Sequence, residues 1–223
     1  MSTARSPATS TTVIQIGTLQ LQLQTPPDFD ALLDEAARRT PDNVDAIPYY
    51  ATLWPSAHAL AKTIWEMRDR LPGQRVLELG CGLGLPAIVA AKLGAAVIAS
   101  DFHPDAGGWC LANAAANGVA LQFHPCDWQT PPAWEPFDLV LGSDLIYERR
   151  HIPALVACVD QLCAPHGLAL LADPGRDGLP QLTDALQTRG WQINLIPCDN
   201  IYVLHCRKGT SPIAVPQRAA TGA

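Results

Sequence analysis

From residue 75 onward the chain alternates short apolar runs with segments of helical periodicity. Strands are expected at 76–79, 95–100, 120–124, 137–142 and 168–172, and helices at 86–93, 104–117, 152–162 and 179–189. Strands that alternate with helices form a parallel sheet covered on both faces. Two further strands, 191–196 and 201–206, follow each other without a helix, which predicts an antiparallel strand at one edge. We therefore expect a doubly wound α/β fold with a mostly parallel sheet.

The residues before this alternation have a different pattern. Apolar and polar residues alternate over 13–24, which predicts a strand hairpin that turns at Gly17-Thr18. Residues 28–39 are typical of a helix capped by Asp28 or Asp30. A second helix is expected over 56–71, with Ser56 as its N-cap.

These patterns predict four successive parts of the chain. Residues 1–12 and 209–223 are small, polar and proline-bearing, which is typical of disordered tails. Residues 13–72 form an N-terminal extension of hairpin and helices, and residues 73–208 form the α/β domain.

Composition and charge narrow the class of protein. Apolar residues make up 48% of the 223 residues, enough for one domain with a sizeable core. The net charge of −6 disfavours a nucleic-acid partner, and no apolar run reaches membrane-spanning length. The 7 cysteines include no Cys-x-x-Cys pair, which indicates reduced thiols and no metal site. We expect a cytoplasmic monomer without a nucleic-acid or membrane partner.

A glycine-rich loop follows the first strand of the α/β domain: Glu78-Leu79-Gly80-Cys81-Gly82-Leu83-Gly84. Ligands bind at the carboxyl ends of strands in open α/β sheets, and glycines let the backbone turn sharply and approach a ligand. A dinucleotide loop needs Gly-x-Gly-x-x-Gly, which would place its third glycine at position 85. Position 85 is leucine and the third glycine is Gly84. This Gly-x-Gly-x-Gly spacing resembles the loop of class I S-adenosylmethionine-dependent methyltransferases, which have a Rossmann-like fold of seven strands.

Acidic residues follow the next two strands. Asp101 ends the second strand, where a carboxylate can accept hydrogen bonds from both hydroxyls of a ribose. Asp127-Trp128 follows the third strand, where a carboxylate can accept from an adenine amino group and an aromatic ring can cover the base. The glycine loop and these acids together predict a nucleoside-binding site.

Two further segments resemble one family in particular. Leu141-Gly142-Ser143-Asp144-Leu145-Ile146-Tyr147-Glu148 is similar to the Asp-x-x-Tyr motif of the seven-strand protein lysine methyltransferases, methyltransferase family 16. Ala51-Thr52-Leu53-Trp54-Pro55 resembles the Trp-Pro segment that this family places before its cofactor fold. The segments 113–118 and 173–176 look most like a branch that contains the electron-transfer-flavoprotein β-subunit lysine methyltransferase and bacterial nicotinamide N-methyltransferase-like proteins. Tyr49-Tyr50 departs from the Tyr-Trp or Phe-Trp of these relatives.

The resemblance implies both a cofactor site and a transfer site, and the cofactor is S-adenosylmethionine, which leaves as S-adenosylhomocysteine. The cofactor-binding residues that it implies are Trp54, Glu78, Gly80, Gly82, Gly84, Asp101, Asp127 and Trp128. The implied catalytic residues are Asp144 and Tyr147, and no metal is implied. The expected acceptor is a lysine side chain of a protein.

The chemistry of methyl transfer agrees with the residue types of the transfer site. Transfer is an in-line displacement at a sulfonium, so positioning and charge dominate. A lysine has a reference pKa of about 10.4 and must lose a proton before it attacks. Asp144 can hold the ammonium in line, and Tyr147 offers a ring wall and a hydroxyl. Asp144 in a capped turn and Tyr147 as a core ring are the structural alternatives, and Arg176 is interpreted as a surface ion-pair residue.

Four other functions remain open at this point, and the first is a nucleic-acid methyltransferase of the amino-adenine or the cytosine-C5 type. An amino-adenine methyltransferase would have an Asn/Asp-Pro-Pro-Tyr run, but residues 144–147 lack both prolines. A cytosine-C5 enzyme would have Pro-Cys there, and the Pro-Cys pairs lie at 125–126 and 197–198 instead. A small-molecule amine or pyridine N-methyltransferase would have the same cofactor-binding residues. Leu85 disfavours an NAD-dependent oxidoreductase, and the intact acids disfavour a non-catalytic binding module.

Overall fold

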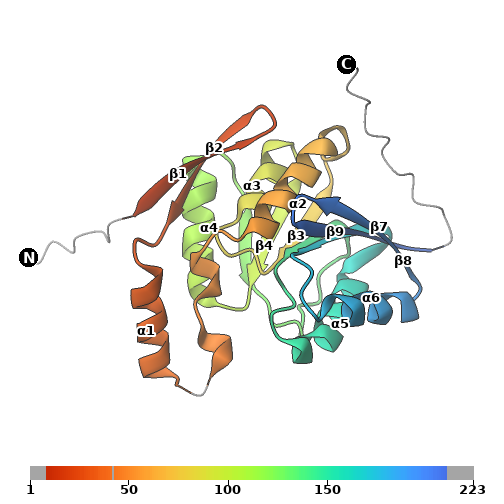
Figure 1. The fold of residues 1–223 in the computed structure, drawn as a ribbon. Coiled ribbons are helices and arrows are strands. Elements are labelled where there is room, and N and C mark those ends of the chain that lie inside the picture. Colours follow the sequence, from red (N-terminus) through yellow and green to blue (C-terminus); the bar gives the residue numbers. More distant parts are fainter. Residues whose placement is uncertain (1–8, 42, 210–223) are drawn as a thin grey trace, which may run out of the picture.

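The computed structural model describes residues 9–41 and 43–209, and its centre is a seven-stranded sheet (Figure 1). The strands of this sheet are β3 (Arg75–Leu79), β4 (Ala96–Asp101), β5 (Gln122–Pro125), β6 (Phe137–Ser143), β7 (Cys163–Asp173), β8 (Trp191–Cys198) and β9 (Ile201–Lys208). They lie in the order β5-β4-β3-β6-β7-β9-β8. The predicted Rossmann-like, mostly parallel seven-stranded sheet is confirmed.

One strand of the sheet is antiparallel to the others, and it does not lie at the edge as expected. The pairs β3–β4, β4–β5, β3–β6 and β6–β7 are parallel, whereas β9 is antiparallel to both β7 and β8. Strand β8 lies at the edge, and Cys198 pairs with Ile201 across the tight turn into β9. The connection after β7 therefore places β8 two strand positions away from β7, and β9 returns antiparallel into the position between them.

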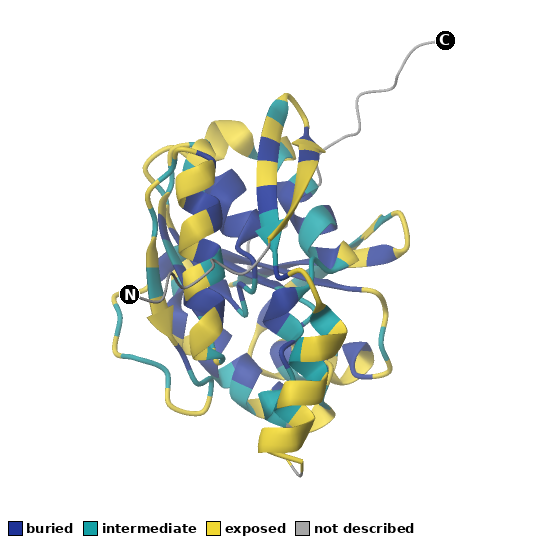
Figure 2. Ribbon diagram, turned by 90° about the vertical axis from the view of Figure 1, so that its left-hand side faces the viewer, coloured by how far each residue is buried: buried dark blue, intermediate teal, exposed yellow. Residues whose placement is uncertain are grey.

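Helices cover the sheet in two layers (Figure 1). One face carries α2 (Pro55–Glu66), α3 (Leu85–Lys92) and α4 (Pro104–Ala116), and the other carries α5 (Ile152–Leu162) and α6 (Leu179–Thr188). Alternate residues of β3 face these layers, with Val76 in the first cluster and Leu77 in the second. Both faces are thus buried, and Figure 2 shows the central strands almost continuously buried.

Helix α2 differs from the prediction at both ends. It begins at Pro55 after Trp54, which has extended backbone angles and makes no side-chain cap. Ser56 is buried inside the first turn, so its predicted N-cap role is wrong. Proline suits this first position because it has no N–H to leave unpaired. The helix ends at Glu66, and a separate 3-10 turn covers Arg68–Arg70.

The N-terminal extension begins with the predicted hairpin, β1 (Ser10–Ile16) and β2 (Leu19–Thr25). Strand β1 begins inside the segment predicted as a tail, whereas residues 1–8 and 210–223 lie outside the described residues. The hairpin buries Ile16, Leu21 and Leu23 in the same core cluster as α2 and α3.

Asn113 of α4 and Asn117, which follows the end of this helix, hold the hairpin through side-chain hydrogen bonds to the backbone of β2. The Asn117 side chain accepts from Gln22 N at 2.9 Å and donates to Gln22 O at 2.7 Å. The Asn113 side chain accepts from Gln24 N at 2.7 Å and donates to Gln24 O at 3.1 Å. Residues four apart share one helix face and residues two apart share one strand edge, so the amides pair with the strand in register. Asn113 also donates to Leu83 O at 3.1 Å, which ties the hairpin to the glycine loop.

The chain then crosses to the sheet through α1 (Phe29–Arg39) and two 3-10 turns, η1 (Val44–Ala46) and η2 (Tyr49–Ala51). Asp28 caps α1 by accepting from Ala31 N at 2.9 Å, as predicted. The crossing brings residues 48–55, the aromatic segment that contains Tyr49, Tyr50 and Trp54, to the carboxyl ends of the strands.

Two properties of the described chain bear on its environment. Six of the seven cysteines are buried and form no disulfide in the described chain. None of the helices formed by residues 9–41 and 43–209 has the length and apolarity needed to cross a membrane.

We expect Asn113→Ala to lower the free energy of unfolding by about 3 kcal/mol, because two backbone groups of Gln24 and the Leu83 carbonyl lose their partner. Asn200→Ala, in the exposed turn before β9, is the matched control and should change it by less than about 0.5 kcal/mol. Urea denaturation measures both, and hydrogen exchange should show faster exchange of the Gln24 amide. An unchanged free energy and an unchanged exchange rate would contradict the role of this amide.

Candidate active site

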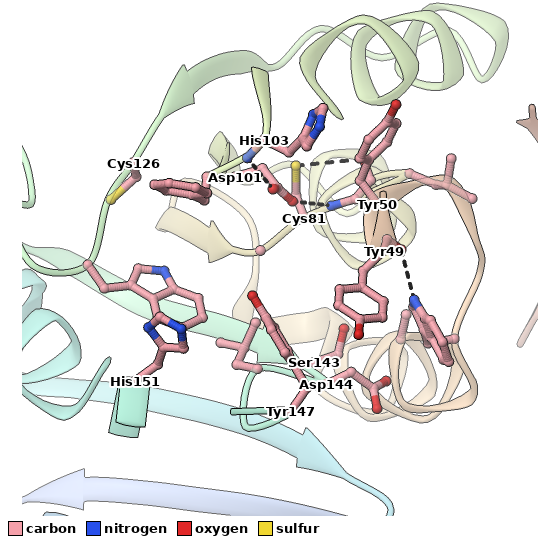
Figure 3. Close-up of a pocket in the computed structure, with 18 of the residues that line it drawn as sticks. Tyr49, Tyr50, Cys81, Asp101, His103, Cys126, Ser143, Asp144, Tyr147 and His151 are labelled. Carbon is pink, nitrogen blue, oxygen red and sulfur yellow. Dashed lines mark hydrogen bonds between the residues drawn. The ribbon is translucent and has the colours of Figure 1, made fainter. Parts of the chain in front are cut away.

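A cavity of about 220 Å³ lies at the carboxyl ends of β3, β4 and β6. Its walls are the glycine loop, the segments that follow β4, β5 and β6, and residues 45–57 of the N-terminal extension. Carboxyl ends of parallel strands meet at one edge of the sheet, which is where open α/β folds bind ligands. Figure 3 shows Cys81, Asp101 and His103 at one end of the cavity, and Tyr49, Ser143, Asp144 and Tyr147 at the other.

The glycine loop has a backbone that side chains rarely adopt. Gly80, Gly82 and Gly84 have φ angles of +63°, +48° and +83°. A Cβ on Gly84 would lie 2.5 Å from the Cys110 sulfur, and a Cβ on Gly82 would lie 3.3 Å from the Tyr50 carbonyl oxygen. The three glycines therefore shape the loop and let the aromatic segment close against it.

Glu78 lies behind this loop and is absent from the lining of the cavity. Its carboxyl is fully buried, and Oε2 accepts from Ala87 N in the first turn of α3 at 2.8 Å. Burial raises the pKa of Glu78 well above its usual value. The side chain thus anchors the start of α3 from the side of the loop away from the cavity.

Asp101 joins the glycine loop to the end of β4. Its Oδ2 accepts from Gly82 N and its Oδ1 from His103 N, both at 2.9 Å. Each oxygen keeps a further lone pair, so the carboxylate can still accept the two hydroxyls of a ribose. Burial raises the pKa of Asp101, although the two backbone donors oppose that shift.

Aromatic and acidic side chains beyond Asp101 can enclose a base. Asp127 uses Oδ1 to accept from Gln129 N at 2.9 Å, which leaves Oδ2 for an exocyclic amino group. The Trp128 ring lines the cavity and packs edge-on against His151 with centroids 6.3 Å apart. Phe102 also lines the cavity while 57% exposed, which suits a ring that a bound ligand would cover.

The opposite end of the cavity has an aromatic wall. The ring centroids of Tyr49 and Tyr147 lie 5.0 Å apart, and those of Tyr49 and Trp54 lie 6.1 Å apart. The Trp54 indole donates to Tyr49 O at 2.9 Å, which fixes both residues. Burial, followed by the charge of Asp45, raises the pKa of Tyr147 to about 12. Its hydroxyl therefore stays protonated near neutral pH and can donate a hydrogen bond.

Asp144 lies at this aromatic end in an unusual backbone conformation, with φ of +59°. Arg176 Nη1 is 2.7 Å from Asp144 Oδ1 and 2.7 Å from Asp173 Oδ2. Asp144 Oδ2 is buried and has no hydrogen-bond partner within the described part of the chain. The interpretation of Arg176 as a surface ion-pair residue was therefore wrong, because its partner is Asp144 and it lines the cavity.

The sheet register explains why these three charges meet. Ser143 of β6 pairs with Ala172 of β7, so Asp144, which follows β6, and Asp173, the last residue of β7, lie side by side. Two adjacent carboxylates repel each other unless a cation lies between them. The turn after β7 supplies that cation, because Asp173 Oδ1 accepts from the backbone N–H of Arg176 at 2.7 Å and folds the residue back.

A charged contact closes one side of the cavity. Asp45 Oδ1 lies 2.8 Å from Arg150 Nη2 and 3.2 Å from His151 Nε2. Both Asp45 and His151 line the cavity, although they are 106 positions apart in sequence. The N-terminal extension is thus fixed to the segment after β6, across the aromatic wall.

The structure brings nine of the ten predicted site residues to this cavity, the exception being Glu78. Sequence reasoning missed Tyr49, Phe102, His151 and Arg176 as lining residues. Tyr49 has a signal in the aromatic segment before Trp54, and Arg176 has one in the pair of acids that follow neighbouring strands. The roles assigned to the predicted residues stay predictions.

The sequence model of the lysine methyltransferase family matches residues 48–177, more than half of the chain. The match spans the aromatic segment, the glycine loop, Asp101, Asp144 and Arg176. It therefore covers most of the cavity.

Curated relatives match the same region. The Danio rerio electron transfer flavoprotein beta subunit lysine methyltransferase is 34% identical over 58% of this chain and 51% of its own length. The Mus musculus histone-arginine methyltransferase METTL23 is 34% identical over 51% of this chain and 47% of its own length. The chain thus spans about half the length of these relatives.

Solved structures share the fold. The 16S rRNA N2 G1207 methyltransferase of T. thermophilus, in complex with AdoMet and guanosine, superposes with a TM-score of 0.68. The superposition covers 90% of this chain and 51% of the T. thermophilus chain, and the two sequences are 16% identical. At this identity the likeness concerns the arrangement of strands and helices.

We expect the affinity for S-adenosylhomocysteine to fall as the pH drops through the raised pKa of Asp101, because only the carboxylate can accept from both ribose hydroxyls. Above that pKa the affinity should level off. Asp101→Asn should weaken binding about tenfold at neutral pH and remove this pH dependence, since an amide has one acceptor oxygen. Calorimetric titration measures both, with the exposed Asp69→Asn as the matched control. Wild-type affinity in Asp101→Asn would contradict the ribose role.

Proposed function

The chain belongs to the lysine methyltransferase family, and from this premise we propose that it transfers a methyl group from S-adenosylmethionine to a lysine side chain of a protein. The observation that carries the proposal is the buried carboxylate of Asp144, which offers one unpartnered oxygen beside the rings that line the cavity. Such a site suits a cation that enters on a narrow side chain.

The cavity residues fit this methyl donor. In the proposal Asp101 accepts the ribose hydroxyls, and Asp127, Trp128 and Phe102 enclose the adenine. The glycine loop lines the cavity with backbone at positive φ angles, and this backbone is the proposed contact for the amino-acid part of the donor. The loop carries no third glycine at Leu85, and the donor contains no phosphate that would need one.

When bound, S-adenosylmethionine supplies an electrophilic methyl carbon on a sulfonium. Asp101 and the rings that would enclose its adenine would hold it so that this methyl passes to the lone pair of the acceptor nitrogen, with the C–S bond breaking as the N–C bond forms. Asp144 holds the acceptor ammonium in line, and the ammonium must release a proton to solvent before its nitrogen can attack. The rings of Tyr49 and Tyr147 form a wall that excludes water and stabilises positive charge. Tyr147 donates its hydroxyl and does not act as the base, because its pKa is raised to about 12.

A guanidinium acceptor is the competing candidate, because one relative of equal identity is a histone-arginine methyltransferase. A small amine is a further candidate acceptor, because the residues proposed to bind the methyl donor would be the same. The exposed Tyr147 ring at the mouth favours an acceptor carried on a larger partner. We place the reaction in the cytoplasm, which agrees with the six buried cysteines that form no disulfide in the described chain.

The first test is to incubate a cell extract with the protein and a labelled methyl donor. We expect label in protein, and acid hydrolysis should release it as methyllysine. Asp144→Asn should reduce this label about a hundredfold, because the neutral amide no longer stabilises the ammonium. Asparagine is the suitable replacement since it tolerates the positive φ of this position.

The same variant should bind S-adenosylhomocysteine within about threefold of the wild type, which separates the acceptor site from the cofactor site. Loss of both methyl transfer and S-adenosylhomocysteine binding in Asp144→Asn would reassign Asp144 to cofactor binding. Label found only in nucleic acid or in small molecules would refute transfer to a protein.

A second test concerns the aromatic wall. Tyr147→Phe keeps the ring and should retain transfer within about threefold, whereas Tyr147→Leu should lose about tenfold through the cation–π contribution. Initial rates of protein labelling measure the difference. Equal rates in the two variants would show that the ring contributes nothing to acceptor binding.

A further inference from the structure

We propose that Arg176 makes the site select a lysine over an arginine acceptor, because it occupies one of the two carboxylate oxygens of Asp144. This inference rests on the proposed function and deepens it, since it names the residue that decides the chemical class of the acceptor. Arg176 acts through Asp144 and is a positioning residue.

The geometry leaves Oδ2 as the one oxygen of the Asp144 carboxylate that has no cation against it in the described chain. Arg176 Nη1 lies 2.7 Å from Asp144 Oδ1, which makes a close, charge-assisted contact. The Asp144 side chain is only 10% exposed, and its Oδ2 is buried without a hydrogen-bond partner in the described chain. Asp144 lines the cavity, so Oδ2 is the oxygen proposed to receive the acceptor. Oδ1 keeps a lone pair, but a cation there would lie against the like charge of Arg176.

Arg176 is itself held in place, so it does not readily leave Asp144. Its Nη1 also lies 2.7 Å from Asp173 Oδ2, and its backbone N–H donates to Asp173 Oδ1 at 2.7 Å. Asp173 is almost fully buried. Burial lowers the pKa of Arg176, but the carboxylates of Asp173 and Asp144 outweigh this and raise it. The guanidinium therefore remains charged at all physiological pH values.

The charges of this cluster require one more cation. Asp144 and Asp173 carry two negative charges and Arg176 carries one positive charge, which leaves a net charge of −1. One incoming cation balances it. Both a lysine and an arginine side chain carry that charge, so charge alone does not distinguish them.

Hydrogen-bond geometry does distinguish them. An ammonium is a compact point charge that a single oxygen can hold. A guanidinium is a planar fork that binds a carboxylate best through two parallel N–H···O bonds, and Arg176 already contacts one of the two oxygens of Asp144. A second guanidinium would keep one bond and would lie beside the like charge of Arg176. The Tyr49 and Tyr147 rings can face either cation, so the selection rests on Asp144 and Arg176.

The test measures binding of two side-chain analogues, butylammonium and propylguanidinium, to the protein loaded with S-adenosylhomocysteine. Ligand-observed NMR titration suits such weak ligands. We expect the wild type to bind butylammonium at least fivefold more tightly than propylguanidinium. Arg176→Met, which has similar length and no donor, should lose or reverse this preference because both oxygens become free. Arg176→Lys should keep it, because a cationic donor remains at Oδ1.

Arg149→Met is the matched control, since Arg149 pairs with Asp177 on the surface and should leave the preference unchanged. Equal affinities of the wild type for the two probes would overturn the inference whether or not each variant folds. A retained preference in Arg176→Met, or a lost one in Arg176→Lys, would also overturn it. The probes need no methyl transfer, so an extract without labelled protein would refute the proposed function while this selection still stood.

Discussion

The parallel register of the sheet is the constraint on which the site depends. Because β3, β4, β6 and β7 run in one direction, the residues after them arrive at a single edge: the glycine loop, Asp101, Asp144 and Asp173. This convergence creates a local excess of negative charge in a largely buried setting. Backbone N–H groups stabilise Asp101, and Arg176 stabilises the Asp144–Asp173 pair. The charge that remains unbalanced is the charge that a cationic acceptor would meet.

The N-terminal extension completes the cavity that the sheet begins. Asn113 and Asn117 give β2 the partners that a neighbouring strand would give, so a hairpin can pack beside a helix without leaving its backbone groups unpaired. Asn113 also bonds to the Leu83 carbonyl, which links the hairpin to the glycine loop. Further along, Asp45 is bonded to Arg150 and His151, and this places Tyr49 opposite Tyr147. Packing of the extension and shape of the cavity are therefore coupled.

Sequence reasoning located the strands, the helices and the glycine loop, because hydrophobic periodicity and glycine spacing are local properties. It placed the antiparallel strand wrongly, since the order of β8 and β9 depends on where a crossover lands in space. It put Glu78 in the cofactor site, yet the alternation of β3 turns this residue toward α3, where it bonds to Ala87 N. It left Arg176 on the surface because its contact with Asp144 follows from the pairing of β6 with β7. Local pattern thus predicted most of the residues that line the cavity, and tertiary pairing decided which of them touch.

The orientation of the bound cofactor tests the account most directly. A crystal structure of the protein with S-adenosylhomocysteine measures the positions of its ribose and its sulfur. The account predicts the ribose hydroxyls on Asp101 and the sulfur nearer to Asp144 than to Asp127, with Asp144 Oδ2 still free. A reversed ligand, or a cofactor amino group bonded to Asp144 Oδ2, would contradict it, because no oxygen would then remain to hold an acceptor.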